Sequence, residues 1–390
     1  MNKIHYSDKE IYFYWITSKD VTKVYNGSET VTITTKERIE YLRNDFSYDF
    51  LLIKYDGKKD IKQSYRDYIE NVDQVKRLTG YNLYRFSKIV NATNYYFMRS
   101  TQIVPENIHD YEFDYIMNSG GGFRFSKKYT GKAWKYDINS FYPSLLTSNI
   151  LRIPIKKGTI KEIDNLDDIK YFKYGVYNVE IIGEHPFFYF NSNNFYTHYE
   201  LNYARSEGLT IKNIGKHLIY GKSDIVKASD IFSDYIDPLF KHKSETKNPI
   251  FKELLNSLWG SLVQTSFRTF KICSKIENVD DNIYDIIKMN PIDDDTYEFT
   301  LIKKHNKNSF INNYARLKPF LLSLARVKMY GYVKKIGIDN IVFSHTDSFI
   351  TTKYLTNSTK IPFNNTKMGY FKFEGCSNNC IVSNMNTYKF

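Results

Sequence analysis

The chain has 390 residues, 42% of them hydrophobic, so it can bury one or more sizeable cores. A net charge of +12, with 35 tyrosines and 28 phenylalanines, suits a partner made of phosphates and stackable bases. The three cysteines fit neither a structural zinc site nor a disulfide framework, and no apolar run approaches the ~18 residues of a membrane span. We therefore expect an intracellular protein that has no membrane partner.

Residues 1 to about 115 alternate short aromatic strands with helices. The pattern predicts a strand at 11–15 and helices over 35–42 and 61–79, which is an α/β arrangement. Asp-Lys-Glu at 8–10 is most simply a solvated charged turn, because Lys9 stands where a core strand would carry an apolar residue.

Three consecutive glycines occupy positions 120–122, and three lysines follow within 127–132. Glycines allow the backbone to approach another surface closely, and the lysines suggest that this surface is a phosphodiester chain. A flexible linker is the alternative interpretation of the same stretch.

The segment Lys135–Ser144 places one carboxylate, Asp137, between an apolar strand and a helix. Pro143 suits a first helical turn, and the two leucines after it continue the helix inward. A carboxylate at such a corner can hold a metal ion beside backbone amides that face a phosphate. Simple capping of the helix by Asp137 is the alternative.

Further along, the chain predicts strands over 174–182 and 187–190 and a helix over 199–208 that ends at its glycine. A second helix begins at Pro249 and aligns Lys252, Asn256, Trp259 and Val263 on one face. A cation, an amide and a ring on one stripe could meet a triphosphate and a base, although an ordinary amphipathic helix has the same spacing.

An acidic stretch over 277–298 interrupts the basic trend and indicates a solvated surface insertion. An apolar helix over 319–336 follows, is ended by Gly337, and leads into a strand over 340–343. Apolar runs then flank a short polar turn, which predicts a β-hairpin that carries Asp347 at its tip.

Three of these segments, taken together, resemble the motifs of family B DNA polymerases. Residues 137–144 are similar to the first palm motif, D-x-x-S-L-Y-P-S, and differ at Phe141. Residues 252–260 resemble the fingers motif K-x-x-x-N-S-x-Y-G, with Trp259 in place of tyrosine.

The third segment, residues 343–348, resembles the palm motif Y-x-D-T-D-S. Asp347 matches the second carboxylate of that motif, which binds both metal ions in the family. His345 replaces the first carboxylate, and this departure leaves its effect on catalysis open.

Weaker similarities surround these motifs. Residues 120–122 resemble the Y-x-G-G segment that contacts the template, and residues 367–374 resemble an L-G-x-W/F-K-x-E segment near the primer terminus. Residues 386–388 match the primer-contacting K-x-Y, with asparagine in place of lysine. The layout of 151–240 resembles the protein-primed branch of the family, found in phages, linear plasmids and viruses, where an insertion helps to hold a terminal protein.

The resemblance implies an α/β (α+β) fold in which residues 116–390 form a polymerase palm with helical fingers at about 240–275. Residues 1–115 would form a degenerate exonuclease-like α/β domain, and the chain would end before a complete thumb. The exonuclease carboxylates are at best half present in the sequence, at 8–10, 44–49 and 68–73. We expect that domain to be inactive.

The resemblance also assigns roles to individual residues. Two Mg²⁺ ions would be held by the catalytic carboxylates Asp137 and Asp347. The nucleotide-binding residues would be Tyr142, Lys252, Asn256 and Trp259. The DNA-binding residues would be Gly121, Gly122, Lys372 and Tyr388. Lys243 and Lys247 both stand where a second phosphate-binding cation is expected, and the sequence does not decide between them.

The function implied is template-directed addition of dNMP to a primer 3′-OH, by a nucleotidyltransferase that uses a DNA template-primer, dNTPs and a terminal protein as primer. The compartment would be the cytoplasm or a mitochondrion of a host that carries a virus or a linear plasmid. A catalytically inactive, polymerase-derived protein that binds nucleic acid is the alternative, and His345 favours it.

Overall fold

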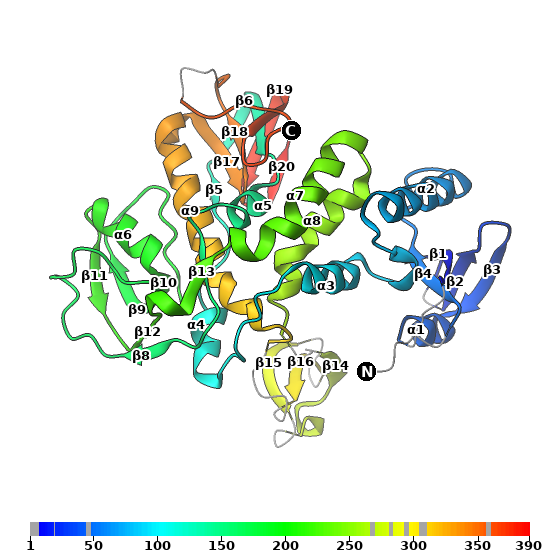
Figure 1. The fold of residues 1–390 in the computed structure, drawn as a ribbon, viewed down its shortest axis with the longest axis horizontal. Helices are drawn as coiled ribbons and strands as arrows, with labels where there is room; N and C mark the ends of the chain where they lie inside the picture. Colours follow the sequence, from blue (N-terminus) through cyan, green and yellow to red (C-terminus); the bar gives the residue numbers. More distant parts are fainter. Residues whose placement is uncertain are drawn as a thin grey trace. The chain divides into compact units, whose positions relative to one another are not determined.

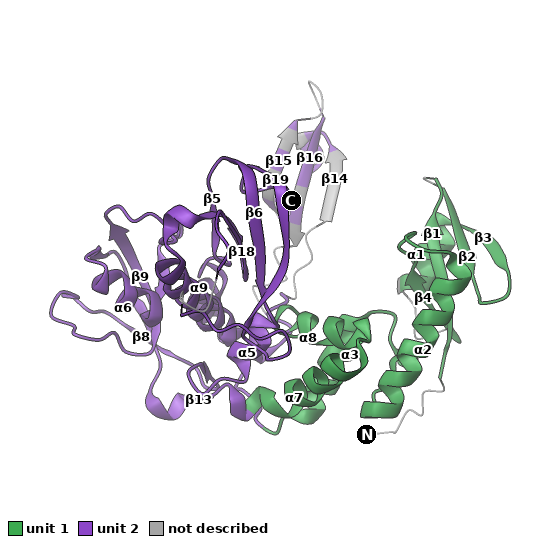
Figure 2. Ribbon diagram, turned by 90° about the horizontal axis from the view of Figure 1, so that it is seen from above, with its two compact units in different colours: residues 1–102, 231–261 green, residues 103–230, 262–390 purple. Residues whose placement is uncertain are grey.

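The computed structural model describes residues 8–18, 20–43, 48–265, 270–280, 284–291, 296–303, 310–355 and 360–390. They form two compact units, residues 1–102 with 231–261 and residues 103–230 with 262–390 (Figure 2). Residues 231–261 therefore belong with the N-terminal segment, whereas the sequence suggested one boundary near residue 115. The assignment of a function to each domain stays a prediction. None of the described helices is both long and apolar enough to cross a membrane.

The first unit contains a four-stranded sheet of order β3-β2-β1-β4 (Figure 1). Its strands are β1 (Glu10–Ile16), β2 (Val21–Tyr25), β3 (Thr30–Thr34) and β4 (Phe50–Lys54). β1 and β4 pair in parallel, which requires a crossover, and α1 (Thr35–Arg43) lies within that connection. This arrangement confirms the α/β character predicted for the segment.

Helix α2 (Ile61–Thr79) packs aromatic rings against this sheet, since Phe13 contacts Tyr65 and Tyr68 with ring centroids 5.4 and 5.5 Å apart. Its ends have clear local causes. The Asp60 side chain accepts a hydrogen bond from the Gln63 N–H, and Gly80 takes a left-handed conformation with φ of 74°.

Three more helices complete the first unit: α3 (Ile89–Ser100), α7 (Ser229–Thr246) and α8 (Pro249–Leu262). Phe97 of α3 stacks on Phe232 of α7 at 5.0 Å. The Ser261 hydroxyl of α8 donates to Asn94 Oδ1 of α3 at 2.8 Å. The helix predicted to begin at Pro249 is thus confirmed, and it is packed against a segment that lies far away in the sequence.

The second unit is built on a six-stranded antiparallel sheet of order β20-β19-β6-β18-β17-β5. The strands are β5 (Arg124–Ser126), β6 (Tyr129–Ile138), β17 (Ile341–His345), β18 (Ser348–Thr351), β19 (Phe371–Asn384) and β20 (Thr387–Lys389). Helix α9 (Leu317–Ile336) packs on this sheet, and its Tyr332 ring lies 4.8 Å from the ring of Phe371. Gly337 ends α9, as predicted.

Between α5 (Phe141–Leu146) and α7, the chain forms a second β-rich region. Its main sheet has the order β10-β9-β12-β8, with β11 added to β9, and β7 pairs with β13. The elements are β7 (Arg152–Pro154), β8 (Thr159–Lys161), β9 (Gly175–Ile182), β10 (Phe195–Thr197), α6 (His198–Ser206), β11 (Thr210–Asn213), β12 (His217–Ile219) and β13 (Ile225–Lys227).

The strand predicted over 187–190 is wrong, because the chain there is irregular. Its backbone N–H groups find side-chain acceptors instead of a neighbouring strand. The Phe188 N–H donates to His185 Nδ1 at 3.0 Å, and the Tyr189 N–H donates to the Tyr330 hydroxyl at 2.9 Å.

The acidic stretch forms an antiparallel sheet of order β14-β16-β15, with β14 (Phe270–Ser274), β15 (Tyr284–Pro291) and β16 (Tyr297–Lys303). Phe299 and Leu301 of β16 are buried, so this sheet has an apolar face of its own. The aspartates at 293–295, which suggested the insertion, lie outside the described residues.

Candidate active site

Asp137 is the penultimate residue of β6, and α5 begins four residues later at Phe141. Between them, Ser140 has φ of 49°, so the chain turns sharply before α5. Ser140 occupies the N-cap position of the helix, while the Asp137 carboxylate forms an ion pair with Lys372 at 3.0 Å. Asp137 therefore does not cap the helix, which removes the simpler alternative for this residue.

The β17–β18 hairpin brings Asp347 to the same place. Ser348 lies directly opposite Asp137 in the β18–β6 pairing, and the Ile138 N–H donates to the Asp347 carbonyl at 2.9 Å. The hairpin turn includes Thr346, whose φ is 61°. The predicted hairpin is confirmed, and it places Asp347, in its turn, beside Asp137 at the end of β6.

Burial makes both carboxyl groups hard to ionise, and the charge of Asp137 adds to this effect at Asp347. Burial, followed by the charge of Asp137, raises the pKa of Asp347 to about 7. Burial also raises the pKa of Asp137, although the neighbouring Lys372 ammonium opposes that effect. Two close carboxylates in a partly buried site attract cations, and their oxygens are the donors that Mg²⁺ prefers. The donor set therefore fits divalent metal ions.

The glycine segment lies against this hairpin. The Thr346 N–H donates to the Phe123 carbonyl at 2.7 Å, and a Cβ added to Gly122 would lie 3.4 Å from both Thr346 Oγ1 and the Tyr142 hydroxyl. Gly120 has φ of +82°, and a Cβ there would meet the Tyr189 ring at 2.6 Å. The structure thus requires glycine at position 120, whereas a Cβ at Gly122 would make ordinary contacts. The packing of the segment does not support a flexible linker.

Arg326 holds the glycine segment in place from α9. Its guanidinium donates to the carbonyls of Ser119, at 3.1 Å, and of Gly121, and it forms a fully buried ion pair with Glu200 at 2.7 Å. Sequence reasoning did not assign this role to Arg326. The available signal was an arginine in a largely apolar predicted helix, because a charge in such a position requires a partner if it is buried.

Tyr142 is partly buried on α5. Burial and, to a smaller extent, the charge of Asp347 raise the pKa of its hydroxyl above the ordinary value. Its hydroxyl therefore lies near Asp347, and the resemblance assigned Tyr142 to nucleotide binding.

The Lys367–Glu374 segment joins the site through β19. The Asn139 N–H donates to the Tyr370 carbonyl at 2.9 Å, and the Gly369 N–H donates to the Asn139 carbonyl at 2.7 Å. Lys372 lies opposite Asp137 in the β19–β6 register. The ammonium of Lys372, a predicted DNA-binding residue, is thus paired with protein carboxylates.

His345 and Tyr388 lie on other strands of the same sheet. His345 ends β17 with an exposed side chain, and its Nδ1 is 3.2 Å from Thr346 Oγ1. The Tyr388 ring, on β20, lies 4.5 Å from the Phe343 ring. Neither side chain is among the causes that shift the pKa of Asp137 or Asp347.

The predicted nucleotide-binding residues of the fingers share α8 in the first unit. Lys252 and Asn256 are exposed and Trp259 is partly buried, whereas six apolar residues of the helix are buried: Ile250, Phe251, Leu254, Leu255, Leu258 and Leu262. Lys243 lies on α7 with its ammonium 5.3 Å from the Phe240 ring, and Lys247 is exposed in the α7–α8 connection. Because the carboxylates belong to the second unit, convergence of both groups on one nucleotide stays a prediction.

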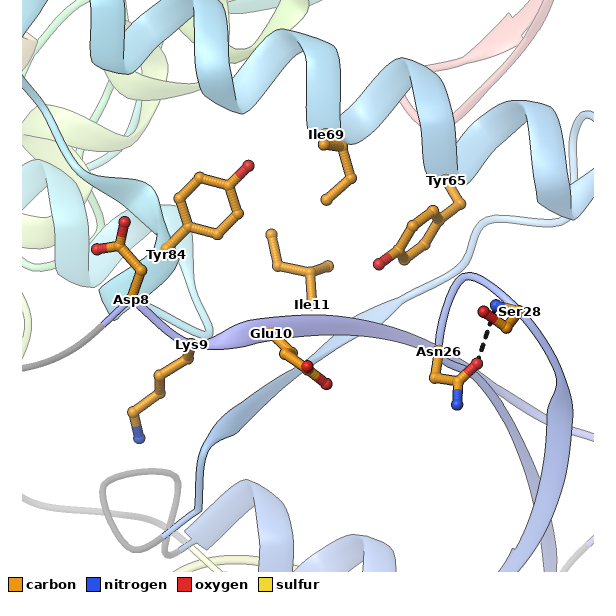
Figure 3. A pocket seen from close by; sticks show the side chains of 9 residues that line it. All are labelled: Asp8, Lys9, Glu10, Ile11, Asn26, Ser28, Tyr65, Ile69 and Tyr84. Atoms are coloured by element: carbon orange, nitrogen blue, oxygen red, sulfur yellow. Dashed lines mark hydrogen bonds between the residues drawn. The ribbon is translucent and has the colours of Figure 1, made fainter.

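A pocket of about 500 Å³ marks the start of β1 in the first unit (Figure 3). Asp8, Lys9 and Glu10 line one side, and Tyr65 and Ile69 of α2 line the other. A solvated turn at 8–10 is wrong, because Glu10 begins β1 and Lys9 is 9% exposed.

Of the candidate exonuclease carboxylates, Asp8 and Glu10 line this pocket, whereas Asp73 does not. Asp8 forms an ion pair with Lys76 at 2.6 Å, and Asp73 accepts a hydrogen bond from the Tyr84 hydroxyl at 2.7 Å. Residues 44–47 of the second exonuclease pattern lie outside the described residues. Within the described part of the chain, no group of three or more histidine, cysteine, aspartate or glutamate side chains is arranged to hold a metal ion.

Comparisons with known proteins agree with this architecture. Residues 2–339 match the sequence profile of the family described as DNA polymerase type B, organellar and viral. No curated protein sequence matches the chain.

Several solved structures of the bacteriophage Phi29 DNA polymerase share the fold. One complex with primer-template DNA superposes with a TM-score of 0.59 at 13% identity and covers 97% of this chain and 86% of that chain. A complex with single-stranded DNA gives 0.55 at 16% identity and covers 96% and 74%, as does the ternary complex with incoming nucleotide. Because the family profile spans most of the sequence and the fold agrees with it, the chain belongs to the organellar and viral type B DNA polymerases.

Proposed function

We propose that the protein is an active DNA-directed DNA polymerase that adds dNMP to a primer 3′-OH on a DNA template. The main observation in support of this proposal is the pairing of β6 with β18, which places Asp137 beside the hairpin that contains Asp347. The raised pKa of both carboxyl groups supports a cationic partner between them. Family membership supports the reaction class.

In this proposal Asp137 and Asp347 hold two Mg²⁺ ions. Bound there, the metal ions would lower the pKa of the attacking hydroxyl and neutralise charge on the triphosphate. The chain itself would supply positioning. Tyr142 would lie under the sugar and exclude a 2′-hydroxyl. Its hydroxyl lies beside the glycine segment, 3.4 Å from the place of a Cβ on Gly122.

In this proposal the remaining contacts come from the residues that the resemblance singled out. Lys252, Asn256 and Trp259 of α8 would bind the incoming dNTP, with Lys243 or Lys247 as a further phosphate contact. Gly121 and Gly122 would let the template approach the backbone, and Arg326 holds the carbonyls of Ser119 and Gly121 in this segment. Lys372 and Tyr388 would contact the primer strand. The Phi29 polymerase complexes with primer-template DNA and incoming nucleotide support these partners.

Protein priming is the finer part of the proposal. It rests on the layout of residues 151–240, where the structure has a β-rich region between α5 and α7. A terminal protein would be held there. The test is transfer of a labelled dNMP to a protein hydroxyl in the absence of any DNA primer, and dependence on an oligonucleotide primer alone would contradict it.

A catalytically inactive, nucleic-acid-binding protein is the second candidate. Two observations favour it: His345 replaces a family carboxylate, and the ammonium of Lys372 occupies one side of Asp137 at 3.0 Å. Both could weaken metal binding. Only an assay of synthesis separates this candidate from the first.

The experiment is primer extension by the purified chain, with Asp137→Asn and Asp347→Asn as test variants and Asp339→Asn as a control on an exposed carboxylate in the same unit. We expect each test variant to lose at least about a thousandfold in rate, because each removes a metal ligand worth several kcal/mol in the transition state. DNA binding should be nearly unchanged. Extension by either test variant at the wild-type rate would refute the assignment, and no extension by the wild type would favour the inactive candidate.

A further inference from the structure

Four charged side chains alternate in sign across β6 and β19, on the sheet face that carries Asp137. Lys135 contacts Glu374 at 3.1 Å, Glu374 contacts Lys372 at 3.1 Å, and Lys372 contacts Asp137 at 3.0 Å. All four side chains are about one quarter to one third exposed. This network links the candidate metal site to two lysines of the same chain.

The strand geometry explains the network. Lys372 and Glu374 are two residues apart on β19, so they point to the same face, and Lys372 lies directly opposite Asp137. A register shift between Phe373 and Gly375 then brings Glu374 alongside Lys135. Lys372 is thus set between two carboxylates, while Lys135 contacts Glu374.

Lys372 offsets the negative charge of one candidate metal ligand more than that of the other. Lys372 contacts Asp137 directly, but it acts on Asp347 only through its charge from farther away. An ammonium at 3.0 Å from a carboxylate repels a divalent cation that binds the same oxygen. A metal ion at Asp137 therefore competes with Lys372, and Glu374 is in place to keep the displaced ammonium.

We infer that Lys372 is a built-in counter-ion of Asp137 that divalent metal displaces toward Glu374, so that metal loading is an ion exchange. This inference rests on the proposed metal site. Lys372 acts here as a positioning residue: it neutralises Asp137 before loading and lowers the affinity of the site for metal. It also places a cation next to the site once the metal has bound.

The test is Mn²⁺ binding by the DNA-free protein, measured from the electron paramagnetic resonance signal of free Mn²⁺. Lys372→Met removes the competing ammonium, whereas Lys135→Met removes one positive charge from the same network without touching Asp137. We expect Mn²⁺ to bind about fivefold more tightly to Lys372→Met, and less than about twofold more tightly to Lys135→Met. If Lys372 had only a structural role, Lys372→Met and Lys135→Met would not differ in their affinity for Mn²⁺.

Stability gives a second readout. In EDTA, Lys372→Met should unfold more easily than the wild type, and saturating Mn²⁺ should reduce that difference because the metal replaces the ammonium. Circular dichroism checks folding, and Lys372→Gln is the substitute if the methionine variant does not fold.

The outcomes separate the two ideas. Mn²⁺ binding that Asp137→Asn abolishes but that Lys372→Met leaves unchanged, or weakens, overturns the ion-exchange role alone. Equal gains in Lys372→Met and Lys135→Met also overturn it, because general electrostatics would then explain both. If the wild type does not bind Mn²⁺, or if Asp137→Asn and Asp347→Asn leave Mn²⁺ binding unchanged, the proposed metal site is overturned as well.

Discussion

Asp347→Asn should stabilise the metal-free protein at alkaline pH. Burial and the charge of Asp137 raise the pKa of Asp347 to about 7 in the folded chain. An unfolded aspartate has a pKa of about 3.9, so folding favours the protonated carboxyl. Above pH 7 the carboxyl is ionised in both states, and the folded state then carries the full cost of burying a repelled charge.

The magnitude follows from linkage. A difference of about three pH units, at 1.36 kcal/mol per unit, sets an upper bound of roughly 4 kcal/mol on that cost at pH 8. Asparagine is nearly isosteric with the protonated carboxyl and carries no charge. We expect Asp347→Asn to raise the free energy of unfolding by about 1–4 kcal/mol at pH 8 in EDTA. The gain should shrink by up to about 2–3 kcal/mol between pH 7 and pH 5, where the wild-type group becomes protonated.

Urea unfolding at several pH values in EDTA measures this difference, and Asp339→Asn, an exposed carboxylate of the same unit, is the matched control. The control should change stability by less than about 0.5 kcal/mol at any pH. Added Mg²⁺ should reduce the difference in free energy of unfolding between Asp347→Asn and the wild type, because only the wild type keeps both metal ligands. The reasoning would be refuted if the difference in free energy of unfolding between Asp347→Asn and the wild type stayed constant from pH 5 to pH 8, or if Asp347→Asn were less stable than the wild type at pH 8.

Three further outcomes follow from the structure. Tyr142→Val should lower the dNTP-to-rNTP ratio of kcat/KM by at least about tenfold, because it opens space beside the sugar; an unchanged ratio would mean that the ring only fills the core. Arg326→Gln should lower the free energy of unfolding in urea by about 3–5 kcal/mol, because it leaves Glu200 buried without its ion pair. The control Lys216→Gln breaks an exposed ion pair and should lower it by less than about 1 kcal/mol. Equal losses would show that the buried pair stabilises the fold no more than the exposed one. The wild type should release no nucleotides from a DNA 3′ end, and release that Glu10→Gln abolishes would show a working exonuclease.

Local sequence was sufficient for most of the elements that position the site. The periodicity over 61–79 and 319–336 predicted α2 and α9 nearly to the residue, and Gly337 marked the end of α9 in advance. The polar turn between apolar runs likewise gave the hairpin of Asp347. Motif residues could be named in advance for the same reason, since their spacing along one element is local information.

The sequence alone did not contain the contacts that those residues make. Asp137 and Asp347 meet through the register of β6 and β18, which joins distant segments. Helix capping by Asp137 was excluded by Ser140 at the N-cap position and by the ion pair of Asp137 with Lys372. Lys372 carried no local sign that its ammonium would pair with Asp137, because the partner of a long side chain depends on which strand lies opposite. The buried pair of Arg326 and Glu200 was likewise invisible, since burial is decided when α9 and α6 pack, and a charge buried there requires a partner whatever its distance along the chain.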